Sequence, residues 1–420
     1  MFDPDRRWLV KLFYRFLDSK WSPFCAAALL LGGIAFVLLR SLVEPRAEVD
    51  FRFFWLAGKL WAGGLDPYGD SFREIGAAIL PPGNVVLYWF YPPQWWSVSR
   101  VMALLELEQA VTVWRLLNGA MILLGTALLV ASVEKEPRRR WIATALWGGI
   151  ALLIEPTANL LAFGQSAGFV FLALTLLTAG VLRREPWLVG LAVFLATFKP
   201  QVGVLVLFWA LLVPHFRVAA LAGLASAGLF TLPHVLRFGA FTTIHEYLAN
   251  AARWGDLPSN TALTSSGPLN LLARIGVEGI ALSWQVPVAI AAIAVAARLI
   301  GEQSARPIMP LALMMAAIAA FIPLHIYDLT ILLIPLILLV AAGATPLWVL
   351  PLVTLLIVRP GKIEALLGLP QYSSGVSAGL IGFDIAALIL FAFAAREALR
   401  SLVGATEPLQ VPALESGRLA

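Results

Sequence analysis

Runs of about 20 apolar residues recur along most of this chain, and they constrain its fold more than any other feature. Hydrophobic residues make up 60% of the 420 residues and charged residues only 13%, whereas about a quarter of the residues of a soluble domain are charged. Because lipid offers no water to backbone N–H and C=O groups, apolar segments of this length must be helices. The sequence therefore predicts an all-α, polytopic transmembrane protein with about 12 spans.

The distribution of Lys and Arg predicts the orientation of these spans. Residues 1–22 combine basic and apolar residues at helical spacing, which is typical of an amphipathic interfacial helix on the cytoplasmic leaflet. We expect a single transmembrane domain over residues 23–398, with outer loops at 44–108 and 234–280 and a disordered cytoplasmic tail at 399–420. The first outer loop is expected to carry interfacial helices. The expected spans are 22–43, 109–133, 141–156, 166–182, two short helices within 187–213, 218–233, 282–297, 308–323, 329–342, 347–358 and 376–394.

Several classes of function are excluded by composition and by missing motifs. The single cysteine, Cys25, cannot build a disulfide framework or a thiolate metal site. The four histidines form no HExxH pattern, and no phosphate-binding glycine loop or nucleophile elbow is present. The net charge of +5 comes from basic residues in short connections between spans, which set topology. We therefore predict no metal, no cofactor and no nucleic-acid partner; a single metal held by scattered carboxylates is the alternative that the sequence leaves open.

Asp50 stands directly before an aromatic, helix-forming run in the first outer loop. Two interpretations fit this position. Asp is a favoured helix N-cap, and a carboxylate on the outer face can also serve as a general base. The local sequence alone does not separate them.

Lys199 interrupts the apolar stretch 187–213 next to Pro200. The proline disfavours helix at the preceding residue, so we expect two short helices that meet at the lysine. A lysine there needs a polar cavity or an anion. The neighbouring spans contain few acidic residues, and Glu155 is the one obvious partner. We therefore favour an anionic ligand such as a lipid phosphate. His325 and Asp328 reach the same outer face in the predicted topology. A carboxylate, a cation and an imidazole together suit deprotonation of a hydroxyl beside a phosphate.

An ordered set of short motifs over residues 50–330 resembles glycosyltransferase family 87, a family of polytopic GT-C transferases that includes mannosyltransferases using polyprenyl-phosphate sugars. The motifs are Asp50-Phe51 with Ala57-Gly58, Gly64-Leu65-Asp66-Pro67-Tyr68, Tyr91-Pro92-Pro93, Trp114-Arg115-Leu116-Leu117-Asn118, Gly164-Gln165, Lys199-Pro200-Gln201, and His325 with Tyr327-Asp328. Ile326 stands where many relatives have an acid.

The resemblance implies that Asp50 is the general base and that the donor is a lipid-linked sugar reached from the membrane. We expect an inverting transfer of a hexose such as mannose to a hydroxyl of a lipid or polysaccharide acceptor, on the non-cytoplasmic face of the plasma membrane. Lys199, His325, Gln201 and Arg274 are expected to bind the donor phosphate. Tyr68, Gln165 and Asp328 are weaker candidates for substrate binding. A transporter or flippase of a lipid-linked saccharide, or an inactive scaffolding relative, remains an alternative.

Overall fold

The computed structural model confirms the expected all-α class, because every regular element it describes is a helix. It describes residues 8–43, 49–79, 88–255, 265–274, 277, 284–302, 307–344, 353–354 and 380–403. In chain order the elements are α1 (Trp8–Asp18), α2 (Ser22–Leu42), α3 (Val49–Ala62), α4 (Ser71–Ile79), α5 (Trp95–Met102), α6 (Leu107–Val133), α7 (Pro137–Leu153), α8 (Glu155–Phe163), α9 (Ala167–Arg183), α10 (Pro186–Ala196), α11 (Pro200–Leu212), η2 (Pro214–Phe216), α12 (Arg217–Phe238), α13 (Ala240–Gly255), α14 (Pro268–Arg274), α15 (Gln285–Glu302), α16 (Ile308–Phe321), η5 (Ile326–Leu332), α17 (Leu333–Ala341) and α20 (Leu380–Val403).

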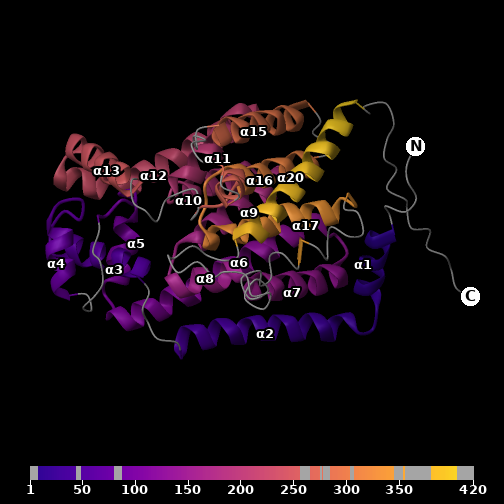
Figure 1. Cartoon of the computed structure of the whole chain (residues 1–420), viewed down its shortest axis with the longest axis horizontal. Helices are drawn as coiled ribbons and strands as arrows, with labels where there is room; N and C mark the ends of the chain where they lie inside the picture. The colour runs from indigo at the N-terminus through magenta and orange to yellow at the C-terminus, as the bar shows by residue number, and fades with distance from the viewer. Residues whose placement is uncertain are drawn as a thin grey trace, which may run out of the picture.

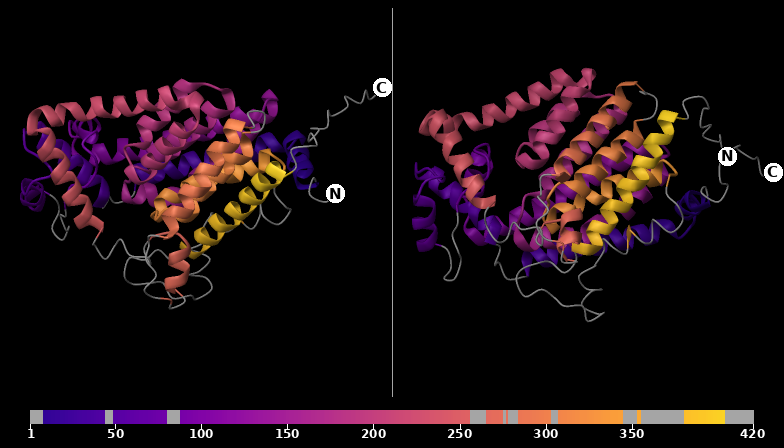
Figure 2. Two further views of the ribbon diagram at one scale, coloured as in Figure 1. Left: turned by 90° about the horizontal axis from the view of Figure 1, so that it is seen from above. Right: turned by 45° about the horizontal axis from the view of Figure 1, so that its top comes forward.

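The short helices of the first outer loop gather at one end of the molecule. α3, α4 and α5 lie there together with α13, and α1 lies at the opposite end (Figure 1). α2 runs along the molecule between these two ends, and the other views keep the same separation (Figure 2). This arrangement agrees with a basic amphipathic helix and an outer loop that are separated by a membrane span.

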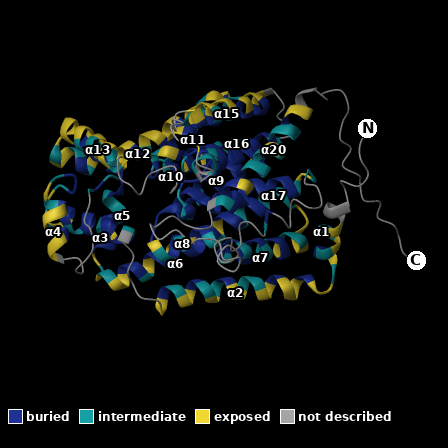
Figure 3. Ribbon diagram, viewed as in Figure 1, coloured by how far each residue is buried: buried dark blue, intermediate teal, exposed yellow. Residues whose placement is uncertain are grey.

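α2 presents one side to the outside and packs its other side on α7 and α6 (Figure 3). Leu31 and Leu39 are more than half exposed on the outer side, as expected for side chains that contact lipid. On the inner side, a Cβ on Gly149 of α7 would lie 2.5 Å from the carbonyl carbon of Leu29. A glycine is required there because the two backbones approach so closely.

Two helix breaks lie next to prolines. α7 and α8 are bent by 56° at Ile154, and Pro156 lies in the first turn of α8, so the span expected at 141–156 is not one straight helix. α10 ends at Ala196 and α11 begins at Pro200, so that Lys199 has a non-helical backbone at the junction. The expected pair of short helices meeting at Lys199 is therefore confirmed.

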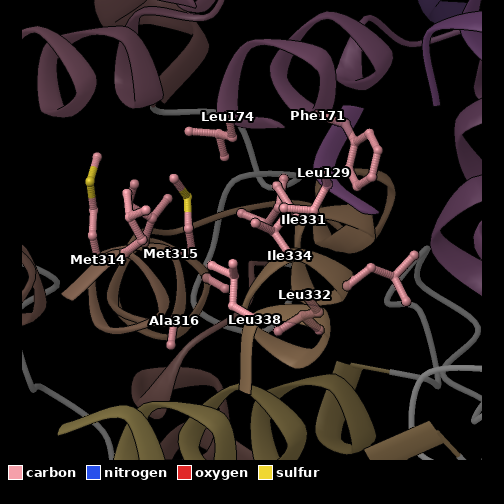
Figure 4. Close-up of a cluster of buried hydrophobic side chains, with 14 of the residues drawn as sticks. Leu129, Phe171, Leu174, Met314, Met315, Ala316, Ile331, Leu332, Ile334 and Leu338 are labelled. Atoms are coloured by element: carbon pink, nitrogen blue, oxygen red, sulfur yellow. The ribbon is translucent and has the colours of Figure 1, made fainter. Parts of the chain in front are cut away.

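Two buried clusters hold the helices together. The aliphatic core centres on α16 and α17, in which every residue from Pro310 to Phe321 and from Leu333 to Val340 is buried. Figure 4 shows Ile334 and Leu338 of α17 in this core, near Leu129 of α6. The second cluster, the aromatic cluster, fills the end of the molecule that carries α3 and α5. Its aromatic members are Phe51, Phe53, Phe54, Trp55, Trp61, Tyr68, Phe72, Trp89, Tyr91, Trp95, Trp114, Phe169 and Phe198.

Several expected spans are shorter than a bilayer is thick. Among the described residues, α2, α6 and the segment Pro214–Phe238 are long and apolar enough to cross a membrane, and the bent pair α7 and α8 adds a fourth if it counts as one span. Other apolar helices have 10–17 residues. In α16, the apolar character reflects burial inside the protein, because neighbouring helices cover it on all sides. The number of about 12 spans stays a prediction.

Some expected boundaries are wrong. The span expected at 218–233 continues to Phe238, with Pro233 inside α12. The last helix runs to Val403, past the expected start of a disordered tail at residue 399. The expected span at 347–358 lies outside the described residues except for 353–354, and residues 404–420 lie outside them entirely.

Candidate active site

Asp50 lies in the first turn of α3, and its carboxylate is held by a side chain from a distant turn. The Nε2 amide of Gln165, between α8 and α9, donates to Oδ2 of Asp50 at 2.7 Å and to the hydroxyl of Tyr91 at 3.1 Å. The Oε1 atom of Gln165 accepts from the N–H of Ser166 at 3.3 Å, which sets the orientation of the amide. A carboxylate that is oriented by a tertiary contact fits a reactive group better than a helix cap.

The surroundings of Asp50 shift its acidity. Burial raises the pKa of Asp50 from 3.8 to about 6, although the hydrogen bond from Gln165 and the charge of Lys199 oppose this rise. A carboxyl group with a pKa near 6 is ionised at neutral pH and is more basic than an ordinary aspartate. This combination suits a general base.

Lys199 forms a buried ion pair with Asp328 of η5. The two side chains are 8% and 1% exposed, respectively. The Nζ atom of Lys199 also lies 5.0 Å from the centre of the Tyr327 ring. From the sequence, Glu155 was the obvious acidic partner and a lipid phosphate the favoured ligand of Lys199. In the structure, the carboxylate of Asp328 pairs with the ammonium.

Asp50 and this ion pair belong to one cluster. The charges of both Lys199 and Asp328 act on the pKa of Asp50, and the ring of His325 lies 5.4 Å from that of Tyr327, centre to centre. The structure thus brings the carboxylate of Asp50 and the ammonium of Lys199 into one cluster, and the imidazole of His325 lies beside the Tyr327 ring that Lys199 also contacts. Their chemical roles stay predictions.

Buried tryptophans donate hydrogen bonds to the backbone at Gln165 and next to Lys199. The Nε1–H of Trp114 donates to the carbonyl oxygens of Gly164 at 2.9 Å and Gln165 at 3.1 Å. The Nε1–H of Trp95 donates to the carbonyl of Phe198, next to Lys199, at 3.0 Å. The sequence did not predict that these tryptophans position the backbone, because tryptophans near a membrane surface are usually explained as interfacial anchors.

A second support holds the segment that carries His325. The N–H of Ser266 donates to the carbonyl of Leu324 at 2.7 Å, and its hydroxyl accepts from the N–H of Leu324 at 3.3 Å. The next residue, Gly267, has φ of +122° and donates its N–H to Oδ1 of Asp384 in α20 at 2.7 Å. The second outer loop and the last helix therefore position the residue that precedes His325.

Two of three further predicted binding residues, Tyr68 and Gln201, have side chains that the structure describes. Tyr68 is 4% exposed, and its hydroxyl donates to the carbonyl of Tyr91 at 2.6 Å, which makes it a support for the loop. Gln201 is exposed in the first turn of α11. Arg274 is the last residue of α14, and its side chain lies outside the described part of the structure.

The described residues contain no group of three or more His, Cys, Asp or Glu side chains placed to hold a metal ion.

The sequence model of glycosyltransferase family 87 matches residues 89–322 of this chain. The chain belongs to glycosyltransferase family 87. The match to family 87 includes Gln165 and Lys199, whereas Asp50 lies before it and His325 and Asp328 lie just after it.

One curated relative is similar to this family 87 protein. It is the polyprenol-phosphate-mannose-dependent alpha-(1-2)-phosphatidylinositol mannoside mannosyltransferase of Mycolicibacterium smegmatis, which is 27% identical over 264 residues. The match covers 59% of this chain and 57% of the relative's length.

Proposed function

We propose that this membrane protein transfers a mannosyl group, with inversion, from a polyprenyl phosphate to a hydroxyl of a lipid or glycan acceptor. The single observation that carries this proposal is the position of Asp50, which is fixed by Gln165 within electrostatic reach of the Lys199–Asp328 pair. Membership of family 87 supports the sugar transfer, and the relative's printed name supports the donor and makes a phosphatidylinositol mannoside the first acceptor to test.

In the proposed reaction, Asp50 removes the proton of the acceptor hydroxyl while the hydroxyl oxygen bonds to the anomeric carbon of the sugar. The bond from that carbon to the phosphate oxygen breaks on the opposite face, and its electron pair leaves on the phosphate. Phosphate is a good leaving group, so the reaction needs stabilisation of negative charge there more than a strong acid.

Lys199 and His325 are the proposed ligands of the leaving phosphate. Lys199 has three N–H donors and Asp328 needs one of them, so the ammonium can bind a phosphate without leaving its partner. The amino end of α11 begins at Lys199 and adds the partial positive charge of the helix dipole. Asp328 keeps the buried ammonium paired when the site is empty.

The proposed topology places this cluster on the non-cytoplasmic side of the plasma membrane. The separation of α1 from α3, α4 and α5 at opposite ends supports this sidedness. The basic amphipathic character of residues 1–22 supports a cytoplasmic amino terminus.

Purified protein incubated with labelled polyprenyl-phosphate mannose and phosphatidylinositol mannoside tests the proposal. A new labelled glycoside with inverted anomeric configuration is expected. Asp50→Asn should reduce the rate by about 10²- to 10⁴-fold. Asp66→Asn is the matched control, because Asn retains the Oδ1 atom that accepts from the N–H of Tyr68. Full activity in folded Asp50→Asn protein, or retention of configuration, would contradict the proposed mechanism.

A further inference from the structure

α13 attaches the first outer loop to the end of α12 through one of its faces. Nδ2 of Asn250 donates to the carbonyl oxygens of Tyr68 at 3.0 Å and Trp89 at 3.1 Å. The ring of Trp254 stacks on Phe90, with centres 3.8 Å apart and planes at 12°. These contacts hold residues 88–91, which end at the tyrosine that shares Gln165 with Asp50.

The opposite face of α13 is apolar and uncovered. Phe241 is 84% exposed, and Ile244 and Leu248 are each 58% exposed. With the exposed Ala252 they form an i, i+3, i+7, i+11 series, which is a continuous stripe along a helix. His245 stacks on Phe241 at the edge of this stripe, with ring centres 6.1 Å apart.

A third face of α13 is polar. Thr242, Glu246 and Arg253 lie roughly 100–140° around the helix from Phe241 at 100° per residue. Arg253 also crosses back to the protein, where its guanidinium lies 5.0 Å from the Tyr88 ring. α13 thus contacts protein on one side, offers apolar side chains on the second and presents polar groups on the third. A helix lying in a membrane interface meets these three environments.

α12, the candidate span that leads into α13, also exposes apolar side chains. Leu229, Leu232 and Leu236 of α12 are 66%, 43% and 77% exposed, and they lead along α12 towards the start of α13. Gly239, with φ of +89°, makes the turn between the two helices, and α13 leaves the end of α12 at a steep angle (Figure 2). If α12 crosses the bilayer, this turn lays α13 along its surface.

We propose that α13 docks on the bilayer, with Phe241, Ile244, Leu248 and Ala252 inserted among the lipid chains on the side of the Asp50 cluster. Phospholipid is the occupant of the stripe because α13 follows directly on α12, a candidate span whose exposed leucines would contact lipid chains in the bilayer. Docking fixes the height of α13, and therefore of residues 88–91, relative to the membrane. Residues 88–91, and through Tyr91 and Gln165 the proposed base Asp50, are then held at a defined distance from the membrane surface.

Spin labelling tests this docking without any measurement of activity. Cys25 is the only cysteine of the sequence, so Cys25→Ser gives a background for single labels. A nitroxide is placed at Leu248→Cys on the stripe or at Thr242→Cys, the matched control, which is exposed on the polar side. Both proteins are reconstituted in vesicles of phosphatidylcholine and phosphatidylglycerol. Collision rates are then measured with oxygen, which concentrates in lipid, and with a water-soluble nickel chelate.

The label at position 248 is expected to collide more often with oxygen than with the nickel chelate, and the label at 242 to show the reverse order. The same order at both positions would overturn the proposal. Line broadening between labels at 248, removed by dilution with unlabelled protein, would show that a second copy of the chain covers the stripe and would also overturn it. Ile244→Cys repeats the measurement one turn away if Leu248→Cys does not fold.

Discussion

The aromatic cluster beside α3 and α5 and the aliphatic core around α16 and α17 both exclude solvent, but they stabilise the protein through different interactions. The aliphatic core contains side chains such as Met314, Ile334 and Leu338, which offer no N–H or O–H groups (Figure 4). The aromatic cluster contains tryptophans whose N–H groups donate to backbone carbonyls beside Gln165 and Lys199. Packing density stabilises both regions, whereas only hydrogen bonds of defined direction fix the backbone around the site.

This difference teaches where precision is needed in the molecule. The stability of the aliphatic core depends mainly on how well its side chains fill space. Asp50 and Gln165 must keep a 2.7 Å contact between residues 115 positions apart in sequence. Rings with a polar edge combine a large buried area with a directional bond, and they connect these distant segments.

The largest expected effect comes from Lys199, at the boundary of the two regions. Lys199→Met leaves the carboxylate of Asp328 buried and unpaired, which should lower the free energy of unfolding by about 3–5 kcal/mol. Loss of a donor to the leaving phosphate should also reduce transfer by about 10²- to 10³-fold. Lys199→Met/Asp328→Leu removes both charges and should recover most of the stability but not the activity. A fully active double variant would show that the pair is only structural.

A substitution in the aliphatic core should affect stability alone. Ile334 is fully buried, and Ile334→Ala should lower the free energy of unfolding by about 2–5 kcal/mol through the cavity it leaves. Denaturation in detergent measures this loss. Because no directional contact to the site is lost, kcat of the folded protein should not change. A large fall in kcat would show that the aliphatic core also positions the site.

Removal of one N–H group from the aromatic cluster should have a smaller effect on stability and a clear effect on activity. Trp114→Phe keeps an aromatic ring but leaves the carbonyls of Gly164 and Gln165 without this donor, at a cost of about 1–3 kcal/mol. Transfer should fall by about tenfold as Gln165 loses its position. Trp209→Phe is the control, because the buried N–H of Trp209 in the aliphatic core has no hydrogen-bond partner among the described residues. Equal effects of the two changes would contradict the proposed role of the tryptophan N–H.

The smallest expected effect is a shift of pH dependence at Gln165. The base must be ionised, so wild-type transfer should fall as the pH drops through about 6, the pKa of Asp50. Gln165→Leu removes a hydrogen bond that lowers this pKa, so the fall should begin at a higher pH. Gln201→Leu, which removes an exposed amide on α11, should leave the profile in place. An unchanged profile in Gln165→Leu would exclude Asp50 as the group that titrates.

The same pKa gives a test of stability with a defined sign. The folded-state pKa of Asp50 lies above its value of 3.8 in an ordinary aspartate, so the folded state binds more protons between these values. The contribution of Asp50 to stability is therefore present below pH 4 and lost as the pH rises through about 6. Asp50→Asn protein should unfold at a higher temperature than wild type at pH 7.5. A lower unfolding temperature would show that the ionised carboxylate stabilises the fold.

The sequence determined features that depend on neighbouring residues. Proline stereochemistry predicts the break between α10 and α11, and the apolar runs predict helices throughout the described chain. Lys199 was identified because a charged residue within an apolar run is costly unless it has a partner, whereas the role of Asp50 as a base was implied by the resemblance to family 87. The pattern of basic residues also agrees with α1 and the outer-loop helices at opposite ends.

Tertiary structure alone decided which groups are paired and which apolar helices are covered by protein. The partner of Lys199 is 129 residues away, and the sequence offered the nearer Glu155 instead. α2 and α16 are both apolar in sequence, yet α2 exposes Leu39 whereas α16 is enclosed. Local stereochemistry acts over the few residues of a helical turn, whereas side-chain partners and burial depend on how whole helices pack. That packing turns a separate acid, amide and lysine into a single site.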